Sequence, residues 1–407
     1  MPGPKGDTGE KGVAGQDGED GQDGEDGQDG EAGPEGEVGP AGASIVRSVP
    51  STSTITTLDA TGNVGTDTSF TIGADGLGLI SYRDANNGNL KVAHCSNTNC
   101  TSATITTLDS TDNVGWYTSI TIGADGFGLI SYTDFTNTAL KVAHCSDTNC
   151  TAATITPLDE TDDVGGRPSI TIGADGLGLI SYYDKTNDDL KVAHCSNTNC
   201  TAATTTTLDE TGNVGWYISI TIGADGLGLI SYYDITNKDL KVAHCSDTNC
   251  TAATITALDE IGGNEGQGTS VTIGADGLGL ISYRDSANFD LMVAHCSNTN
   301  CTAATINTLD STPSTGRYPS ITTGADGLGL ISYHDHTNQD LKVAHCSDTN
   351  CTAATINTLD SGSNFSEPSV TIGADGLGLI VYYESFVGDL KVAHCENAFC
   401  APYFRRR

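Results

Sequence analysis

Cysteine and histidine recur together at a fixed spacing. The segment "HCSDTNC" at residues 144–150 occurs seven times, with Asn for Asp in places and as "HCENAFC" at 394–400. Two cysteines this close across a hairpin suit a disulfide, whereas one His and two Cys per unit converge poorly on a tetrahedral metal ion. We therefore predict seven disulfides, with free thiols or metal sites as the alternatives. The predicted pairs are Cys95–Cys100, Cys145–Cys150, Cys195–Cys200, Cys245–Cys250, Cys296–Cys301, Cys346–Cys351 and Cys395–Cys400.

The repeated histidines are expected to be structural. Each lies in an apolar segment, where a backbone group or an aspartate would accept its hydrogen bond, and Asp75 and its equivalents in "GADG" are expected in turns. The residues concerned are His94, His144, His194, His244, His295, His345 and His394. No His-Glu-x-x-His, phosphate-binding loop or isolated reactive cysteine occurs, so the sequence predicts no enzyme. A glycosidase or lyase is the third alternative for the function.

These residues belong to a repeat of about 50 residues, a period typical of propellers and solenoids. One unit reads as four short strands: "SITIGAD" (A), "GLISYYD" (B), "LKVAHC" (C) and "AATTTTLD" (D). Val, Ile, Thr and Tyr are enriched in them, and turn residues separate them. Four antiparallel strands per unit is the pattern of a propeller blade.

The ends of the repeat region favour a closed ring. A copy of strand D, "STITTLD" at 53–59, precedes the first strand A, and none follows Cys400. Pairing this strand with the last unit would remove the exposed sheet edge, whereas a linear solenoid would need caps at both ends. We predict an all-β, seven-bladed β-propeller over residues 51–400, closed by its N-terminal strand, with strand A lining the axis.

Glycine occupies every third position from Gly3 to Gly42. Only glycine fits at the axis of a collagen triple helix, so this segment resembles the collagen-like stalks of bacterial, phage and large-virus surface proteins. That resemblance implies a homotrimer; an acidic disordered tail is the alternative. The expected organisation is a stalk at 1–44, a linker at 45–50, the propeller at 51–400 and a tail at 401–407.

The repeat itself, with its "ISYYD" and "LKVA" segments, is similar to uncharacterised bacterial propeller repeats. The resemblance spans residues 51–400. It implies the propeller fold and carries no ligand.

Charge and cysteine content restrict the partners and the compartment. The net charge of −34 argues against binding nucleic acid, and no apolar stretch approaches the length of a membrane-spanning helix. Seven disulfides imply an oxidising location, either extracellular or at a cell or virion surface. Met1-Pro2-Gly3 does not begin a typical signal peptide, so we expect another export route or an altered start.

One face of the ring is expected to bind a ligand. The A–B turns and C–D loops are nearly identical between units, whereas the D–A and B–C loops, which open on the other face, differ. Aromatic side chains beside Asp and Asn suit carbohydrate, although Trp116 and Trp216 could instead pack between blades. The candidate ligand-binding residues are Trp116, Tyr117, Arg167, Trp216, Tyr217, Arg317, Tyr318 and His334.

No cofactor is predicted, although Asp184 with Asn187 and Asp189 is an arrangement that could bind calcium. Taken together, the sequence predicts an extracellular or surface-exposed head-and-stalk protein for adhesion or recognition, whose ligand is a carbohydrate or a surface protein. The alternative is a structural component of a surface layer, fibre, virion or phage tail without a specific ligand.

Overall fold

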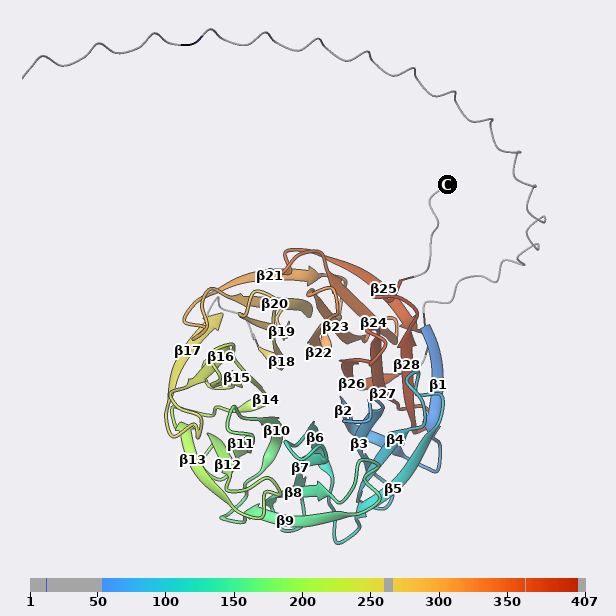
Figure 1. The fold of residues 1–407 in the computed structure, drawn as a ribbon, viewed down its shortest axis with the longest axis vertical. Coiled ribbons are helices and arrows are strands. Elements are labelled where there is room, and N and C mark those ends of the chain that lie inside the picture. The colour runs from blue at the N-terminus through green and yellow to red at the C-terminus, as the bar shows by residue number, and fades with distance from the viewer. Residues whose placement is uncertain (1–11, 13–52, 260–265, 363, 402–407) are drawn as a thin grey trace, which may run out of the picture. The chain divides into compact units, whose positions relative to one another are not determined.

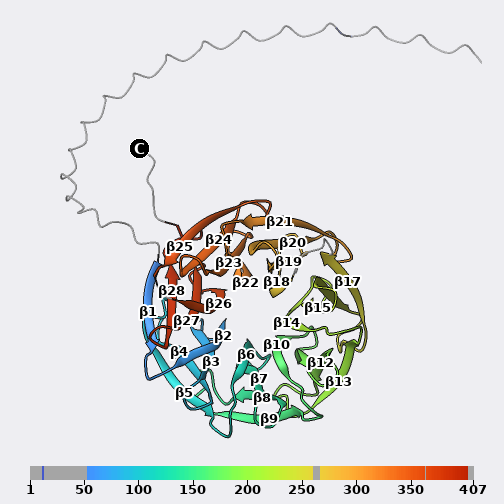
Figure 2. The same ribbon diagram turned by 180° about the vertical axis from the view of Figure 1, so that it is seen from behind.

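The computed structural model describes Gly12 and residues 53–259, 266–362 and 364–401. The chain separates into two units, Met1–Ser48 and Val49–Arg407. In the second unit, seven four-stranded antiparallel sheets are arranged around a ring, which confirms the predicted seven-bladed propeller. Figure 2 shows the same ring from behind. The predicted stalk (apart from Gly12), the linker and residues 402–407 lie outside the described residues.

Each blade runs from an inner strand A to an outer strand D. Blades 1 to 4 are formed by β2 (Val64–Ile72), β3 (Gly78–Asp84), β4 (Asn89–Cys95) and β5 (Ala103–Asp109); β6 (Trp116–Ile122), β7 (Gly128–Asp134), β8 (Ala139–Cys145) and β9 (Ala153–Asp159); β10 (Gly166–Ile172), β11 (Gly178–Asp184), β12 (Asp189–Cys195) and β13 (Ala203–Asp209); and β14 (Trp216–Ile222), β15 (Gly228–Asp234), β16 (Asp239–Cys245) and β17 (Ala253–Asp259).

Blades 5 to 7 repeat this order. They are formed by β18 (Gln267–Ile273), β19 (Gly279–Asp285), β20 (Asp290–Cys296) and β21 (Ala304–Asp310); β22 (Arg317–Thr323), β23 (Gly329–Asp335), β24 (Asp340–Cys346) and β25 (Ala354–Asp360); and β26 (Phe365–Ile372), β27 (Gly378–Glu384), β28 (Asp389–Cys395) and β1 (Ser53–Asp59).

The ring closes through its first strand. β1 pairs antiparallel with β28, so blade 7 takes its outer strand from the N-terminal side of the propeller. In Figure 1 the blue β1 lies beside the red β28. The predicted closure and the predicted bounds of that strand are confirmed.

The inner strands are joined by a serine in strand A. The backbone N–H of Ile170 donates to Ser119 Oγ of the preceding blade at 3.1 Å, and Ile220 donates to Ser169 Oγ at 3.2 Å. Equivalent bonds join the other blades from β2 to β26. A small hydroxyl side chain thus satisfies a buried backbone group where the strands crowd together.

A buried Tyr–Asp–Lys cluster joins neighbouring blades near their outer strands. Tyr182 Oη and Lys191 Nζ of blade 3 donate to Asp159 Oδ2 of blade 2 at 2.7 and 2.8 Å. Burial acts to raise the pKa of Asp159, but hydrogen bonds from Lys191, Thr161 and Tyr182 outweigh it and hold the pKa below its usual value. The same cluster at Asp59 ties β1 to blade 1, so closure uses the contact that joins the other blades.

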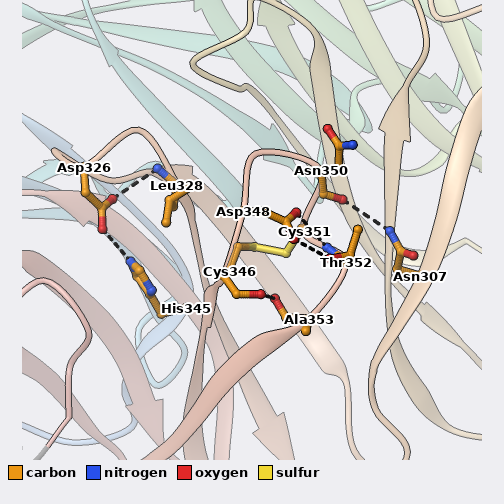
Figure 3. Close-up of a disulfide and its surroundings, with 11 residues drawn as sticks. Asn307, Asp326, Leu328, His345, Cys346, Asp348, Asn350, Cys351, Thr352 and Ala353 are labelled. Atoms are coloured by element: carbon orange, nitrogen blue, oxygen red, sulfur yellow. Dashed lines mark hydrogen bonds and ion pairs between the residues drawn. A yellow bond between two sulfur atoms is a disulfide. The ribbon is translucent and has the colours of Figure 1, made fainter.

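The cysteines form the predicted pairs, but not as direct cross-strand neighbours. Cys145 lies opposite Ala153, while Cys150 lies in the C–D loop with a φ of 53°. The bridge therefore closes the loop and not the strand ladder, with a Cα–Cα distance of 4.8 Å. Figure 3 shows the equivalent bridge Cys346–Cys351, where Asp348 also accepts hydrogen bonds from Thr352. No described cysteine is free.

Candidate functional site

Strand A contains a bulge that the sequence did not predict. In blade 3, Gly166 pairs with Tyr183 and Ser169 with Ser181, so Arg167 and Pro168 together face one residue of β11. The first bulge residue has φ near +50°, a left-handed conformation that favours glycine. Strand A therefore begins three residues before the predicted "SITIGAD", and the "GAD" segment forms the turn instead.

Every blade has this bulge, and six of the seven left-handed positions carry a side chain. A non-glycine residue in this conformation costs about 1–2 kcal/mol, so the fold alone would favour glycine here. Only blade 5 has glycine at this position. The seven residues, in blade order, are Asp67, Tyr117, Arg167, Tyr217, Gly268, Tyr318 and Glu367.

These seven residues surround a cavity of about 220 Å³. Its lining consists of the left-handed residue and the next residue from each of the seven blades, so the cavity lies on the propeller axis. We call it the axial pocket. Because strand A begins at the D–A loop, the pocket opens on the face where the loops differ.

Two carboxyl groups lie together at one side of the axial pocket. The backbone N–H of Asp67 donates to Glu367 Oε2 at 2.6 Å, across the junction between blades 1 and 7. Burial and the neighbouring Glu367 raise the pKa of Asp67 to about 8. Burial also raises the pKa of Glu367, against the opposing effects of the Asp67 N–H and Arg167. The pair therefore holds a proton at neutral pH.

Arg167 extends among aromatic rings. Its guanidinium carbon lies 4.6 Å from the ring centroids of both Tyr117 and Tyr217 and 5.0 Å from that of Trp216. These are cation–π distances. One cation thus holds aromatic rings from blades 2 and 4 around the pocket.

The structure brings only part of the predicted ligand-binding set together. Tyr117, Arg167, Tyr217 and Tyr318 line the axial pocket, and Arg317 lines a second cavity beside it. The expectation of exposed loop residues is wrong for His334, which lies within β23 and is 2% exposed. It is buried because strand B is covered on both faces by neighbouring blades.

The two tryptophans are half-buried rather than exposed, and neither lines the axial pocket. Arg83 of blade 1 stacks on Trp116 of blade 2, with 3.8 Å between the guanidinium carbon and the ring centroid. Trp216 packs against Tyr183 of blade 3 at 5.5 Å. The alternative interpretation, packing between blades, therefore describes both tryptophans.

Sequence reasoning did not single out Asp67 and Glu367. They occupy the same repeat position as Tyr117, so a residue-by-residue alignment of the seven units would have found them. The bulge is the reason that they were missed, because the residues at the start of strand A were assigned to the D–A loops.

The other face of the propeller is uniform. His345 Nε2 lies 2.8 Å from Asp326 Oδ2, and Asp326 Oδ1 accepts the backbone N–H of Leu328 in the A–B turn (Figure 3). Seven such His–Asp pairs occur among the described residues. The predicted structural role of the histidines and of the "GADG" aspartates is confirmed.

Two of the three predicted calcium ligands, Asp184 and Asn187, are used by their own loop. Asp184 Oδ1 accepts the backbone N–H groups of Thr186 and Asn187, and its Oδ2 accepts the Asn187 side chain at 3.0 Å. Within the part of the chain that the structure describes, no three His, Cys, Asp or Glu side chains are grouped to hold a metal ion. No helix long and apolar enough to cross a membrane is found among these residues either.

Comparison with known proteins identifies the two parts of the chain separately. The family model "Collagen triple helix repeat (20 copies)" matches residues 1–46. No curated protein matches the chain. The N-terminal segment is therefore collagen-like, as predicted, while the similarity to bacterial propeller repeats remains a prediction.

Solved structures match the propeller at low identity. Kuenenia stuttgartiensis hydrazine synthase has a TM-score of 0.57 at 10% identity, covering 81% of this chain and 95% of that one. Penicillium chrysogenum α-L-arabinanase has a TM-score of 0.50 at 12% identity, and the match covers 69% of this chain and 92% of that one. Streptococcus pneumoniae NanB sialidase has a TM-score of 0.50 at 9% identity, and the match covers 84% of this chain and 70% of that one. At these identities the similarity shows the propeller fold alone.

Proposed function

We propose that the propeller binds carbohydrate in the axial pocket and acts as the recognition head of a stalked extracellular surface protein. The observation that carries this proposal is the set of six side chains held in a backbone conformation that favours glycine. Three tyrosines, one arginine and two carboxyl groups supply apolar ring faces, donors and acceptors around one cavity. Sugar rings have apolar faces and hydroxyl groups that match such a lining.

The test is to replace the left-handed tyrosine of three blades by glycine, the residue that blade 5 has at this position. In the variant Tyr117→Gly/Tyr217→Gly/Tyr318→Gly, the backbone is relieved of left-handed strain while the ring faces are lost. On a glycan array, and then by calorimetry on the strongest ligand, we expect at least a tenfold loss of affinity, about 1.4 kcal/mol, with the fold retained.

A matched control lies on the uniform face. Phe127→Leu introduces the residue that the other six units carry after "GADG", and it should leave the affinity within twofold. Equal affinity in the triple glycine variant and the wild-type protein would contradict carbohydrate binding in the axial pocket.

The Asp67–Glu367 pair favours a second function, glycoside hydrolysis, because two neighbouring carboxyl groups that hold a proton between them can act as acid and base. We propose binding without turnover. Incubating the bound glycan with the wild-type protein and measuring released reducing ends distinguishes the two. Turnover that Glu367→Gln abolishes would replace recognition by catalysis.

The collagen-like segment supports a homotrimer, since the triple helix needs three chains. We expect light scattering to give three times the chain mass for the full protein and one chain mass for a protein lacking residues 1–44. Monomers in both cases, without a triple-helix circular dichroism signal in the cold, would contradict the trimer. The alternative is a structural fibre without a ligand, which predicts that the protein binds no glycan on the array.

A further inference from the structure

A second, smaller cavity of about 80 Å³ lies beside the axial pocket at blades 4 to 6. It shares Tyr217, Gly268 and Tyr318 with the axial pocket, and its remaining lining is Gln267, Arg284 and Arg317. Arg284 pairs across the sheet with Gln267, and Arg317 with His334. Two guanidinium groups from adjacent blades therefore meet at one cavity.

Several polar atoms of this cluster are buried without partners. Nε and Nη2 of Arg284 and Nε of Arg317 have no hydrogen-bond acceptor. Both ring nitrogens of His334, which is 2% exposed, and Nδ1 of His336 also lack partners. Leaving a buried polar group unsatisfied costs about 1–3 kcal/mol, and more for a charged one, so an absent acceptor is indicated.

The cationic groups of this cluster oppose one another's charge. Burial and the neighbouring Arg317 lower the pKa of Arg284. Burial, His336 and Arg317 lower the pKa of His334 to about 4. The nearest carboxylates are engaged elsewhere: Asp285 accepts from its own loop, and Asp335 is paired with Lys342 and Asn338. Asp285 attracts Arg284 from a distance, but neither arginine forms an ion pair with a carboxylate among the described residues.

Blade 1 carries an arginine at the same position, and its Nη2 has an acceptor. Arg83 is the structural equivalent of Arg284, since it pairs with Thr66 as Arg284 pairs with Gln267. Its Nη2 donates to Asn113 Oδ1 at 2.9 Å, and its guanidinium stacks on Trp116. Arg83 lines neither cavity. Arg83 Nε also lacks an acceptor, so this arginine is satisfied only in part. Arg284 stacks on Phe289, with 4.8 Å between the guanidinium carbon and the ring centroid, but neither its Nε nor its Nη2 has an acceptor.

We propose that the Arg284–Arg317 cavity binds one oxyanion, the sulfate or carboxylate group of an acidic glycan whose sugar ring lies in the axial pocket. Guanidinium groups bind both anions through paired N–H donors, and the cavity volume suits a single group. The connection to a glycan rests on the proposed function, whereas the oxyanion site itself does not. A chain of net charge −34 repels anions overall, so binding must come from this local site.

The first experiment uses inorganic sulfate on the full-length protein at constant ionic strength, read by calorimetry. Arg317→Gln copies Gln267, and Arg284→Thr copies Thr133, the residue that blade 2 carries at the same position. We expect each variant to weaken sulfate binding at least tenfold, and the matched control Arg83→Gln to change it less than twofold. An adventitious ion only, bound equally by all four proteins, would overturn the proposal, as would no binding by the wild-type protein.

Glu260 and Glu265 precede β18 in the sequence and lie outside the described residues. To test whether their carboxylates neutralise Arg284 and Arg317, the sulfate titration is repeated on the variant Glu260→Gln/Glu265→Gln. Sulfate binding that arises only in this variant would contradict the proposal, because the cations would then be neutralised within the chain.

The second experiment compares a sulfated glycan, a uronic acid glycan and their neutral counterparts. We expect the acidic glycans to bind at least tenfold more tightly, and Arg317→Gln to remove that advantage while leaving neutral binding unchanged. Equal affinity for acidic and neutral glycans would overturn the acidic specificity but leave carbohydrate binding intact. Sulfate binding without any glycan binding would instead contradict the proposed function and retain the oxyanion site.

Discussion

At the scale of single residues, the side chains that line the axial pocket occupy strained, left-handed backbone positions. The left-handed bulge position costs free energy for any side chain, yet six blades keep one there, and the side chains differ from blade to blade. Around them, the serines of strand A and the Tyr–Asp–Lys clusters repeat almost unchanged. Met292 is an exception, since it replaces the lysine of blade 5, where Tyr283 donates to Asp259.

The carboxyl pair gives a prediction for stability against pH. The pKa of Asp67 is raised from a usual value near 4 to about 8, so the folded state holds the extra proton. Its contribution to the free energy of unfolding therefore falls as pH rises from about 4 to 8. We expect Asp67→Asn, which mimics the protonated group, to match the wild-type protein at pH 5 and to be more stable at pH 8.5 by roughly 1 kcal/mol or more.

Thermal unfolding at both pH values checks this prediction, with Glu367→Gln expected to act in the same direction. The clustered aspartates such as Asp159 have lowered pKa values and lose their contribution only as pH falls below about 4, so they do not interfere. An equal loss of stability at pH 5 and pH 8.5 in Asp67→Asn would contradict the shared proton.

At the scale of elements, sequence reasoning did well where a segment repeats. Strands B, C and D have the predicted bounds to within one residue, because alternating Val, Ile, Thr and Tyr between turn residues specify them. The start of strand A was missed, since a bulge with variable residues carries no periodic signal. The same bulge determines which side chains face the axis, so the candidate site was found only in part.

The disulfides give a prediction at this scale. Each closes a loop of the same size in the same surroundings, and both sulfurs are fully buried. Loop entropy assigns about 2 kcal/mol to each bridge. We expect Cys145→Ala/Cys150→Ala and Cys346→Ala/Cys351→Ala each to lower the free energy of unfolding by about this amount, and the two losses to add, since the blades lie apart.

Denaturant unfolding with fixed m-value measures both losses, and the wild-type protein under reducing agent provides the reference. Unchanged stability in either double variant would show that the bridge contributes nothing in that blade. A combined loss far above the sum would show that blades 2 and 6 are coupled through the ring.

At the scale of the whole molecule, one strand decides whether the ring is closed. β1 satisfies the edge of β28, and its Asp59 receives Tyr82 and Lys91 of blade 1. The sequence predicted this closure from a single surplus copy of strand D. The contact through Asp59 could not be predicted, because it depends on which blades become neighbours.

Removing residues 53–59 should lower the melting temperature by about 10 °C or more and cause association through the open edge. Moving the same seven residues to follow Cys400 should restore both, because the other six blades attach strand D by that route. Differential scanning calorimetry and light scattering measure the two effects. A deletion protein that melts like the wild-type protein would contradict closure by β1.

We propose that the variable side chains around the propeller axis form a carbohydrate site. The most direct measurement is a crystal structure of the propeller with the glycan selected on the array. We expect a sugar ring in the axial pocket, against Tyr117 or Tyr217 and within hydrogen-bond distance of Asp67, Arg167 or Glu367. A glycan bound on the uniform face of "GADG" turns and Cys loops, with the axial pocket empty, would contradict it.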